Sequence, residues 1–231
     1  MSDLNTVPAL ETSSVRWERE AGEFAAATKA LARELAQNAA PFIGVFGSAR
    51  DSDKAPWLHW LYGDVFAKAL GKLLARRQVS MLSGGCPGMV DLAQEAFCNN
   101  RRDAAAQKSV GIRITCLGFH EPANPHLDET LHAPDFGSRL ELMLQLCAAF
   151  VVLGGGIGSL LEVAYFLQHV QAVNGHRDKP IILVGRMWYP VTWLLRVMAW
   201  LGTVDRADID RIQVASSLKR VEQVIDKVLS D

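Results

Sequence analysis

The sequence has few cysteines, and no pattern brings them together. Its four cysteines, Cys86, Cys98, Cys116 and Cys147, lie far apart, and no C-x-x-C pair occurs. Zinc sites and disulfide frameworks both need closer spacing than this. Scattered thiols are typical of proteins that stay reduced, and they predict a cytoplasmic location for the chain.

The chain also lacks a long apolar run and an excess of either charge. No stretch approaches the ~20 apolar residues that span a bilayer, and the polar segment Met1–Ser14 has no apolar signal core. The 24 basic and 25 acidic side chains give a net charge of −1. Such a balance offers no electrostatic attraction for nucleic acid or for an acidic membrane. We therefore expect a small-molecule ligand, with neither nucleic acid nor membrane as a partner.

Two common nucleotide-binding fingerprints are missing as well. No G-x-G-x-x-G is followed by an acidic residue about 20 positions later, and no glycine loop carries the P-loop lysine. Neither a dinucleotide enzyme nor a typical nucleoside triphosphatase is therefore favoured. His120, His126 and His132 recur at six-residue intervals, which is no familiar ligand spacing, so we expect neither a metal nor a cofactor.

The most informative stretch that is present runs from Ala149 to Glu162 and reads AFVVLGGGIGSLLE. An apolar run rich in β-branched residues passes into glycines and then into an apolar helical pattern, which predicts a strand, a tight loop and a helix. Glycines let a backbone approach a ligand closely and adopt positive φ. The N–H groups at the start of the helix then face the loop, where phosphate is the usual occupant.

Apolar strand patterns alternate with helical patterns along most of the chain. The strand patterns begin near Phe42, Val79, Val110, Ala149 and Pro180, and the clearest helical patterns cover Val15–Asn38, Trp57–Arg76, Ser138–Cys147 and Leu218–Leu229. This alternation predicts βαβ units and a parallel sheet covered on both faces. We expect an α/β, Rossmann-like, doubly wound fold with a flexible tail at residues 1–14 and a single domain at 15–231.

Glycine turns follow three of the predicted strands. Their candidate ligand-binding residues are Gly47 and Ser48 in the first turn, Gly84, Gly85, Gly88 and Met89 in the second, and Gly155, Gly156, Gly158 and Ser159 in the third. Asp91, just after the second turn, is either an acid in the first turn of a helix or a ligand of the substrate. Because ligands bind beyond the carboxyl ends of parallel strands, the three turns should meet at one site.

Two charged residues belong to this region. Ser159 and Glu162 match the S-x-x-E capping box, so a structural role competes with a catalytic one. Arg139 lies near the start of its helix, where a cation opposes the dipole, and it heads an apolar stripe. An anionic partner explains this arginine better than an exposed position does.

These motifs resemble the Lonely Guy (LOG) family, whose members were long labelled lysine decarboxylases. Arg139-Leu140-Glu141-Leu142-Met143 is similar to its R-K-x-x-M, and Gly154 to Glu162 is similar to its P-G-G-x-G-T-x-x-E. The two earlier glycine turns and Asn124-Pro125-His126 also resemble family motifs. Together they cover residues 40–205.

The resemblance implies a homodimer that hydrolyses the N-glycosidic bond of a nucleoside 5′-monophosphate, such as AMP or a cytokinin riboside monophosphate. By match to the motifs, Arg139 and Glu162 take the positions of the catalytic pair, and Gly155 to Ser159 take the phosphate loop. The leucine at 140, the glycine at 154 and the serine at 159 depart from the family pattern. The loss of the lysine at 140 removes a charged donor and favours the alternative, a non-catalytic carrier similar to the molybdenum-cofactor carriers. Lysine decarboxylation is not expected, because it normally needs pyridoxal phosphate on a lysine.

Overall fold

A computed structural model describes residues 13–49, 63–114, 123–172 and 179–230. One parallel sheet in the order β4-β3-β2-β1-β5-β6-β7 runs through it. Its strands are β1 (Phe42–Phe46), β2 (Ser80–Ser83), β3 (Ser109–Ile114), β4 (Glu129–Ala133), β5 (Cys147–Val152), β6 (Ile181–Val184) and β7 (Ile212–Ala215). The predicted Rossmann-like parallel sheet is confirmed.

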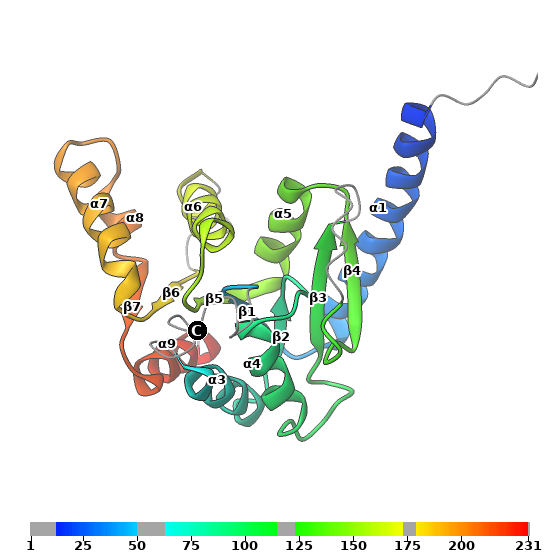
Figure 1. The fold of residues 1–231 in the computed structure, drawn as a ribbon, viewed down its shortest axis with the longest axis horizontal. Helices are drawn as coiled ribbons and strands as arrows, with labels where there is room; N and C mark the ends of the chain where they lie inside the picture. Colours follow the sequence, from blue (N-terminus) through cyan, green and yellow to red (C-terminus); the bar gives the residue numbers. More distant parts are fainter. Residues whose placement is uncertain (1–12, 50–62, 115–122, 173–178, 231) are drawn as a thin grey trace, which may run out of the picture.

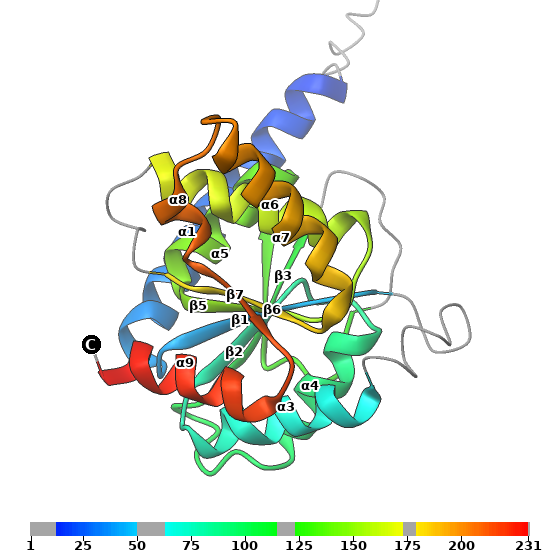
Figure 2. The ribbon, with the colours of Figure 1, turned by 90° about the vertical axis from the view of Figure 1, so that its left-hand side faces the viewer.

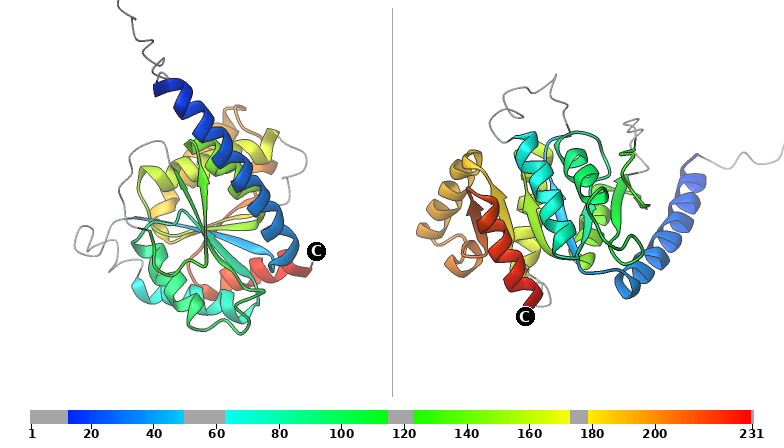
Figure 3. Two further views of the ribbon diagram at one scale, coloured as in Figure 1. Left: turned by 90° about the vertical axis from the view of Figure 1, so that its right-hand side faces the viewer. Right: turned by 90° about the horizontal axis from the view of Figure 1, so that it is seen from below.

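Helices cover both faces of this sheet (Figures 1 and 2). On one face lie α3 (Asp64–Arg76), α4 (Met89–Cys98) and α9 (Leu218–Ser230). On the other lie α1 (Ser13–Asn38), α5 (Phe136–Leu146), α6 (Ile157–Ala172), the short η2 (Arg186–Trp188), α7 (Tyr189–Trp200) and α8 (Arg206–Ile209). The views in Figure 3 show α1 beyond the β4 edge and α7 beyond the β7 side. None of the described helices is long and apolar enough to cross a membrane.

Alternation along the strands divides the core into two halves. Ile43 and Val45 of β1 face the cluster formed with α3, α4 and α9. Phe42 and Phe46 face the opposite cluster, formed with α1, α5 and α6. Near-continuous apolar strands of this kind are expected where both faces of a parallel sheet are buried.

The second cluster contains a compact aromatic group next to β1. The rings of Phe150 and Phe166 are stacked with centroids 4.1 Å apart, and Phe46 lies 5.3 Å from Phe166. A Cβ at Gly44 would come within 2.9 Å of both Phe46 and Phe150. The glycine therefore makes room for two aromatic rings on the same face of the sheet.

The prediction of five strands missed the two at the edges, β4 and β7. The irregular, proline-containing segment after β3 ends in β4, and β7 lies between α8 and α9, just before the predicted helix Leu218–Leu229. The helix expected from Trp57 begins at Asp64 in the structure, and residues 50–62 lie outside the described part. The predicted tail at 1–14 also lies outside it, except that Ser13 and Ser14 belong to α1.

We predict opposite effects for two glycine-to-alanine changes in helices. At Gly71 in α3, a Cβ would overlap the carbonyl oxygen of Ala93 in α4, so Gly71→Ala should lower the free energy of unfolding by about 1–3 kcal/mol. At Gly158 in α6, a Cβ would meet open space, so Gly158→Ala should leave it unchanged or raise it by up to about 1 kcal/mol. Denaturant unfolding of both variants checks this. A stable Gly71→Ala protein would contradict the close packing of α3 on α4.

Candidate active site

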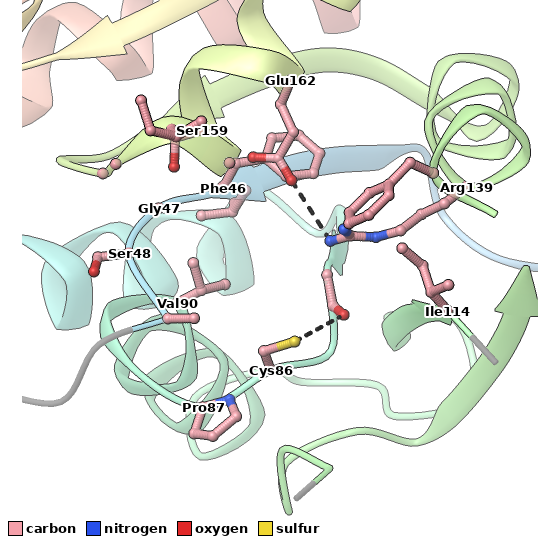
Figure 4. A pocket seen from close by; sticks show the side chains of 18 of the residues that line it. Phe46, Gly47, Ser48, Cys86, Pro87, Val90, Ile114, Arg139, Ser159 and Glu162 are labelled. Atoms are coloured by element: carbon pink, nitrogen blue, oxygen red, sulfur yellow. Dashed lines mark hydrogen bonds and ion pairs between the residues drawn. The ribbon is translucent and has the colours of Figure 1, made fainter. Parts of the chain in front are cut away.

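A cavity of about 700 Å³ opens beside the neighbouring strands β1 and β5, where the order of the strands in the sheet reverses. From β1 the chain moves outward to β2, β3 and β4, and from β5 it moves the other way to β6 and β7. Such a switch point, at the carboxyl ends of the strands, is where doubly wound sheets bind ligands. The cavity is lined by Val45, Phe46, Gly47, Ser48, Ala49, Gly84, Cys86, Pro87, Val90, Arg113, Ile114, Phe136, Arg139, Gly155, Gly156, Ile157, Gly158, Ser159 and Glu162 (Figure 4).

The start of α6 forms one wall of this cavity. The first i→i−4 hydrogen bond runs from the Leu160 N–H to the Gly156 carbonyl, 3.1 Å. The N–H groups of the residues before Leu160 therefore have no partner within the helix, and the positive end of the helix dipole lies beside them. A Cβ at Gly156 or Gly158 would meet nothing within 4 Å. The wall thus leaves space in which an anion can approach the backbone.

The three glycine turns contact one another around the cavity. The Ser48 N–H donates to the Gly154 carbonyl, 2.9 Å, and the Met89 N–H donates to the Ser48 carbonyl, 3.1 Å. Gly88 has φ +109°, and a Cβ there would lie 2.5 Å from the Ser48 carbonyl oxygen. The positive φ expected of the third turn is found instead in the second, at Gly85 and Gly88. The third turn uses glycine for space, because a Cβ at Gly155 would overlap the Ser159 hydroxyl.

Arg139 reaches into the cavity from α5. The Asp135 carboxylate caps this helix by accepting from the Ser138 N–H, 2.8 Å, which fixes its first turn. The Arg139 Nε donates to the Ile112 carbonyl of β3, 3.0 Å, and its Nη2 lies 3.5 Å from the Glu162 Oε1. A Cβ at Gly84 would overlap that Nη2, so the guanidinium packs directly on the backbone of the second turn.

Glu162 faces Arg139 from α6, as Figure 4 shows. The residue is only 8% exposed. Burial raises the pKa of its carboxyl to about 7, although the neighbouring Arg139 charge acts in the opposite direction. Because this pKa lies near neutral pH, the group can exchange a proton under working conditions, a property common to catalytic carboxyls.

The structure corrects two expectations for this region. The capping box is wrong, because α6 begins at Ile157 and Ser159 lies inside its first turn, while Glu162 lies in the second turn and points to Arg139. Leu140 is 2% exposed and belongs to the core cluster with Phe42 and Phe150. Leu140 does not line the cavity. The expectation that the change from lysine to leucine removes a charged donor from the site is therefore wrong, because position 140 faces the core.

The structure brings most, but not all, of the predicted ligand-binding residues to the cavity. Those that line it are Gly47, Ser48, Gly84, Gly155, Gly156, Gly158 and Ser159, together with Arg139 and Glu162. Gly85, Gly88, Met89 and Asp91 lie outside the lining. Met89 is fully buried in the core, and Asp91 places its Oδ1 3.8 Å from the Nε2 of His126.

Sequence reasoning missed Arg113 and Phe136, which also line the cavity. Arg113 lies near the carboxyl end of β3, the edge at which ligands bind, and a charged residue ending an apolar strand was a usable signal. Phe136 opens α5 and is 38% exposed. Within the described residues, no three His, Cys, Asp or Glu side chains gather as a metal site would need.

The family model described as possible lysine decarboxylase matches residues 92–228, more than half of the sequence. The chain belongs to this family. The membership predicted from the motifs around Arg139 and Glu162 is therefore confirmed. The match includes 10 of the 19 residues that line the cavity, Arg139 and Glu162 among them, and the first two glycine turns lie before it.

Two curated relatives match part of the chain. The cytokinin riboside 5′-monophosphate phosphoribohydrolase of Mycobacterium tuberculosis is 29% identical over 159 residues, which cover 66% of this chain and 80% of that protein. The pyrimidine/purine nucleotide 5′-monophosphate nucleosidase of Escherichia coli K12 is 24% identical over 124 residues, which cover 52% of this chain. The aligned part is only 27% of the length of that nucleosidase.

Solved structures share the fold at lower identity. The molybdenum cofactor carrier protein of Chlamydomonas reinhardtii superimposes with a TM-score of 0.59 at 20% identity. The match covers 83% of this chain and 99% of the carrier. At this identity the similarity establishes the Rossmann-like fold and nothing about the ligand.

The burial of Glu162 predicts a specific dependence of stability on pH. The folded protein holds this proton up to about pH 7, whereas an ordinary glutamate loses it near 4.5. The raised pKa of Glu162 therefore contributes to the free energy of unfolding in full below pH 4.5, and this contribution is lost as the pH rises through 7. Glutamine does not titrate, so the free energy of unfolding of Glu162→Gln should rise relative to that of the wild type as the pH increases from 4.5 to 7, by up to about 3 kcal/mol.

Denaturant titrations at pH 5, 6, 7 and 8 measure this difference. Glu95→Gln provides the control, because the Glu95 side chain is 40% exposed and its replacement should give nearly the same difference at each pH. A constant difference between Glu162→Gln and the wild type would mean that the buried carboxyl titrates like an exposed one.

Proposed function

We propose that the protein hydrolyses the N-glycosidic bond of nucleoside 5′-monophosphates to the free base and ribose 5-phosphate. The observation that carries the proposal is that the Arg139–Glu162 pair, 3.5 Å apart, lines one cavity together with the glycine-lined start of α6. Both curated relatives are named for reactions on nucleotide 5′-monophosphates, which supports this substrate class.

The start of α6 suits the 5′-phosphate. Unpaired N–H groups and the helix dipole favour a dianion there, and Gly156 and Gly158 leave room for it. Phosphate binding at this wall holds the ribose over the cavity. Binding energy from a part of the substrate that does not react then helps to position the reacting carbon.

Glu162 suits the reacting carbon. As the bond between C1′ and the base nitrogen breaks, its electrons leave with the base and positive charge develops on the ribose. An ionised carboxylate stabilises this charge and orients the water whose oxygen adds to C1′, while the base nitrogen takes up a proton. The neighbouring Arg139 charge favours this ionised form of Glu162.

The label of the family as possible lysine decarboxylase does not fit this cavity. Decarboxylation of amino acids normally uses pyridoxal phosphate held on a lysine. No lysine stands among the lining residues in the described part of the chain. The hydrolysis of a glycosidic bond instead draws on a carboxylate beside the reacting carbon, and Glu162 supplies one in this cavity.

We predict base release from AMP, and loss of that release on removal of either charge. Glu162→Gln and Arg139→Met should each lower kcat/KM by about 100-fold or more, since each removes charge that matters most in the transition state. Liquid chromatography of free base and ribose 5-phosphate measures this with AMP, CMP and isopentenyladenosine monophosphate. Adenosine, which lacks the phosphate, serves as the control substrate and should be a poor one.

The wild-type rate should rise as the pH passes through 7 and level above about 8, because the ionised form of Glu162 is the active one and its pKa is about 7. A rate that falls across this range would assign Glu162 to the opposite role, as an acid. Tight binding of a nucleotide without any release of base would instead favour the carrier function, which the shared fold with the molybdenum cofactor carrier allows.

We also propose that the protein forms a homodimer through α6 and α7. Both helices expose large apolar residues: Ile157 is 82% exposed, Leu161 45%, Trp193 66% and Trp200 83%. Monomers rarely expose so many large apolar side chains on neighbouring elements, and a second copy of the chain would cover those that lie outside the cavity.

The dimer can be checked by light scattering after size-exclusion chromatography. The wild type should elute at about twice its chain mass of 25.3 kDa, and Trp193→Glu should shift the protein toward the monomer while the fold persists. Lys219→Glu on α9, on the opposite face of the sheet, is the control and should leave the mass unchanged. A wild type that stays monomeric at every concentration would refute the proposal.

A further inference from the structure

Gln94 is a buried polar residue behind the cavity, on α4. It is 0% exposed, and it does not line the cavity. It lies on the buried face of α4, where an apolar side chain would ordinarily be found. A buried amide costs free energy unless it is fully hydrogen-bonded, so its partners indicate why it is tolerated.

Gln94 joins three separate segments of the chain through its amide. Its Oε1 accepts from the Ser83 hydroxyl of β2, 3.0 Å, and from the Asn124 Nδ2, 2.7 Å. Its Nε2 donates to the Ser109 hydroxyl of β3, 3.1 Å. That hydroxyl in turn donates to the carbonyl of His126, 2.7 Å. Each donor meets an acceptor, so the network fixes the orientation of the amide.

The same partners hold both backbone groups of Gly85. The Gly85 N–H donates to the Ser83 hydroxyl, 3.0 Å, and its carbonyl accepts from the Asn124 N–H, 3.1 Å. Gly85 has φ +71°, a conformation that needs such support from its surroundings. Two of the residues that bond to Gln94 therefore fix the second glycine turn.

This turn supports Arg139. The guanidinium Nη2 packs on the backbone of Gly84, where no side chain would fit, and the turn continues to Cys86, drawn below Arg139 in Figure 4. A displacement of the turn changes the surface on which the guanidinium rests, and with it the 3.5 Å approach to Glu162. Positioning errors of about 1 Å can cost 100-fold in rate.

We infer that Gln94 is a positioning residue that sets the second glycine turn, and through it the Arg139–Glu162 pair. The inference deepens the proposed function and rests on it for its kinetic consequence. Its structural consequence, the stiffness of the turn at Gly85, can be measured whether or not the protein is an enzyme.

The chain offers a matched control in Gln107, a second buried glutamine. It is 2% exposed, donates to the Ala75 carbonyl at 2.8 Å and accepts from the N–H groups of Arg102 and Asp103 at 2.9 and 3.2 Å. It precedes β3, at the end of the sheet away from the cavity. Gln94→Met and Gln107→Met each keep the side chain's length and remove its hydrogen bonds.

Kinetics and amide exchange on both variants test the inference. Relative to Gln107→Met, Gln94→Met should lower kcat for AMP hydrolysis about tenfold or more with a smaller change in KM. It should also accelerate hydrogen exchange at the Gly85 amide, followed by NMR, about tenfold or more. Both variants should lose some thermal stability, so stability alone does not separate them.

Equal kinetics and equal Gly85 exchange in the two variants would overturn the inference. If Gln94→Met does not fold, Ser83→Ala replaces it, because it removes the acceptor of the Gly85 N–H directly and should show the same two effects. If the wild type releases no base from any nucleotide, the proposed function fails. The exchange at Gly85 then decides the positioning role by itself.

Discussion

The structure of the site depends on one constraint: a carboxylate removed from water must be compensated. Glu162 is 8% exposed on α6, and its compensation is the guanidinium of Arg139, 3.5 Å away. Arg139 is in turn held by β3 and by the backbone of the second turn. The pair therefore joins α5, α6 and β3 at the carboxyl edge of the sheet. Burying a charged pair lowers stability, and proteins retain such pairs mostly at functional sites.

The sequence predicts the centre of the sheet much better than its edges. β1, β5 and β6 are buried on both sides and form continuous apolar runs, so their patterns are plain. β4 and β7 lie at the two edges, and in each only part of the strand is buried: Leu131 and Ala133 in β4, and Ala215 in β7. Half-exposed strands of four or five residues do not stand out from loops, and tertiary pairing decides them.

The site was predictable as far as motifs and topology reach. Glycine turns after three strands must meet at the carboxyl edge of a parallel sheet, and Arg139 and Glu162 do meet there. Contacts that depend on packing could not be read in this way. The burial of Leu140 follows from how α5 rests on the sheet, and the amide network of Gln94 joins residues that no spacing rule connects.

The cavity is built from parts of the chain that are distant in sequence. β1 pairs with β2 on one side and with β5, about one hundred residues later, on the other, and the walls come from turns after three different strands. No local segment can form this surface alone, so it comes into existence only when the central pairing of β1 with β5 has closed a long loop. A ligand of this cavity therefore recognises the native chain and not its unfolded forms, and occupancy shifts the folding equilibrium by mass action.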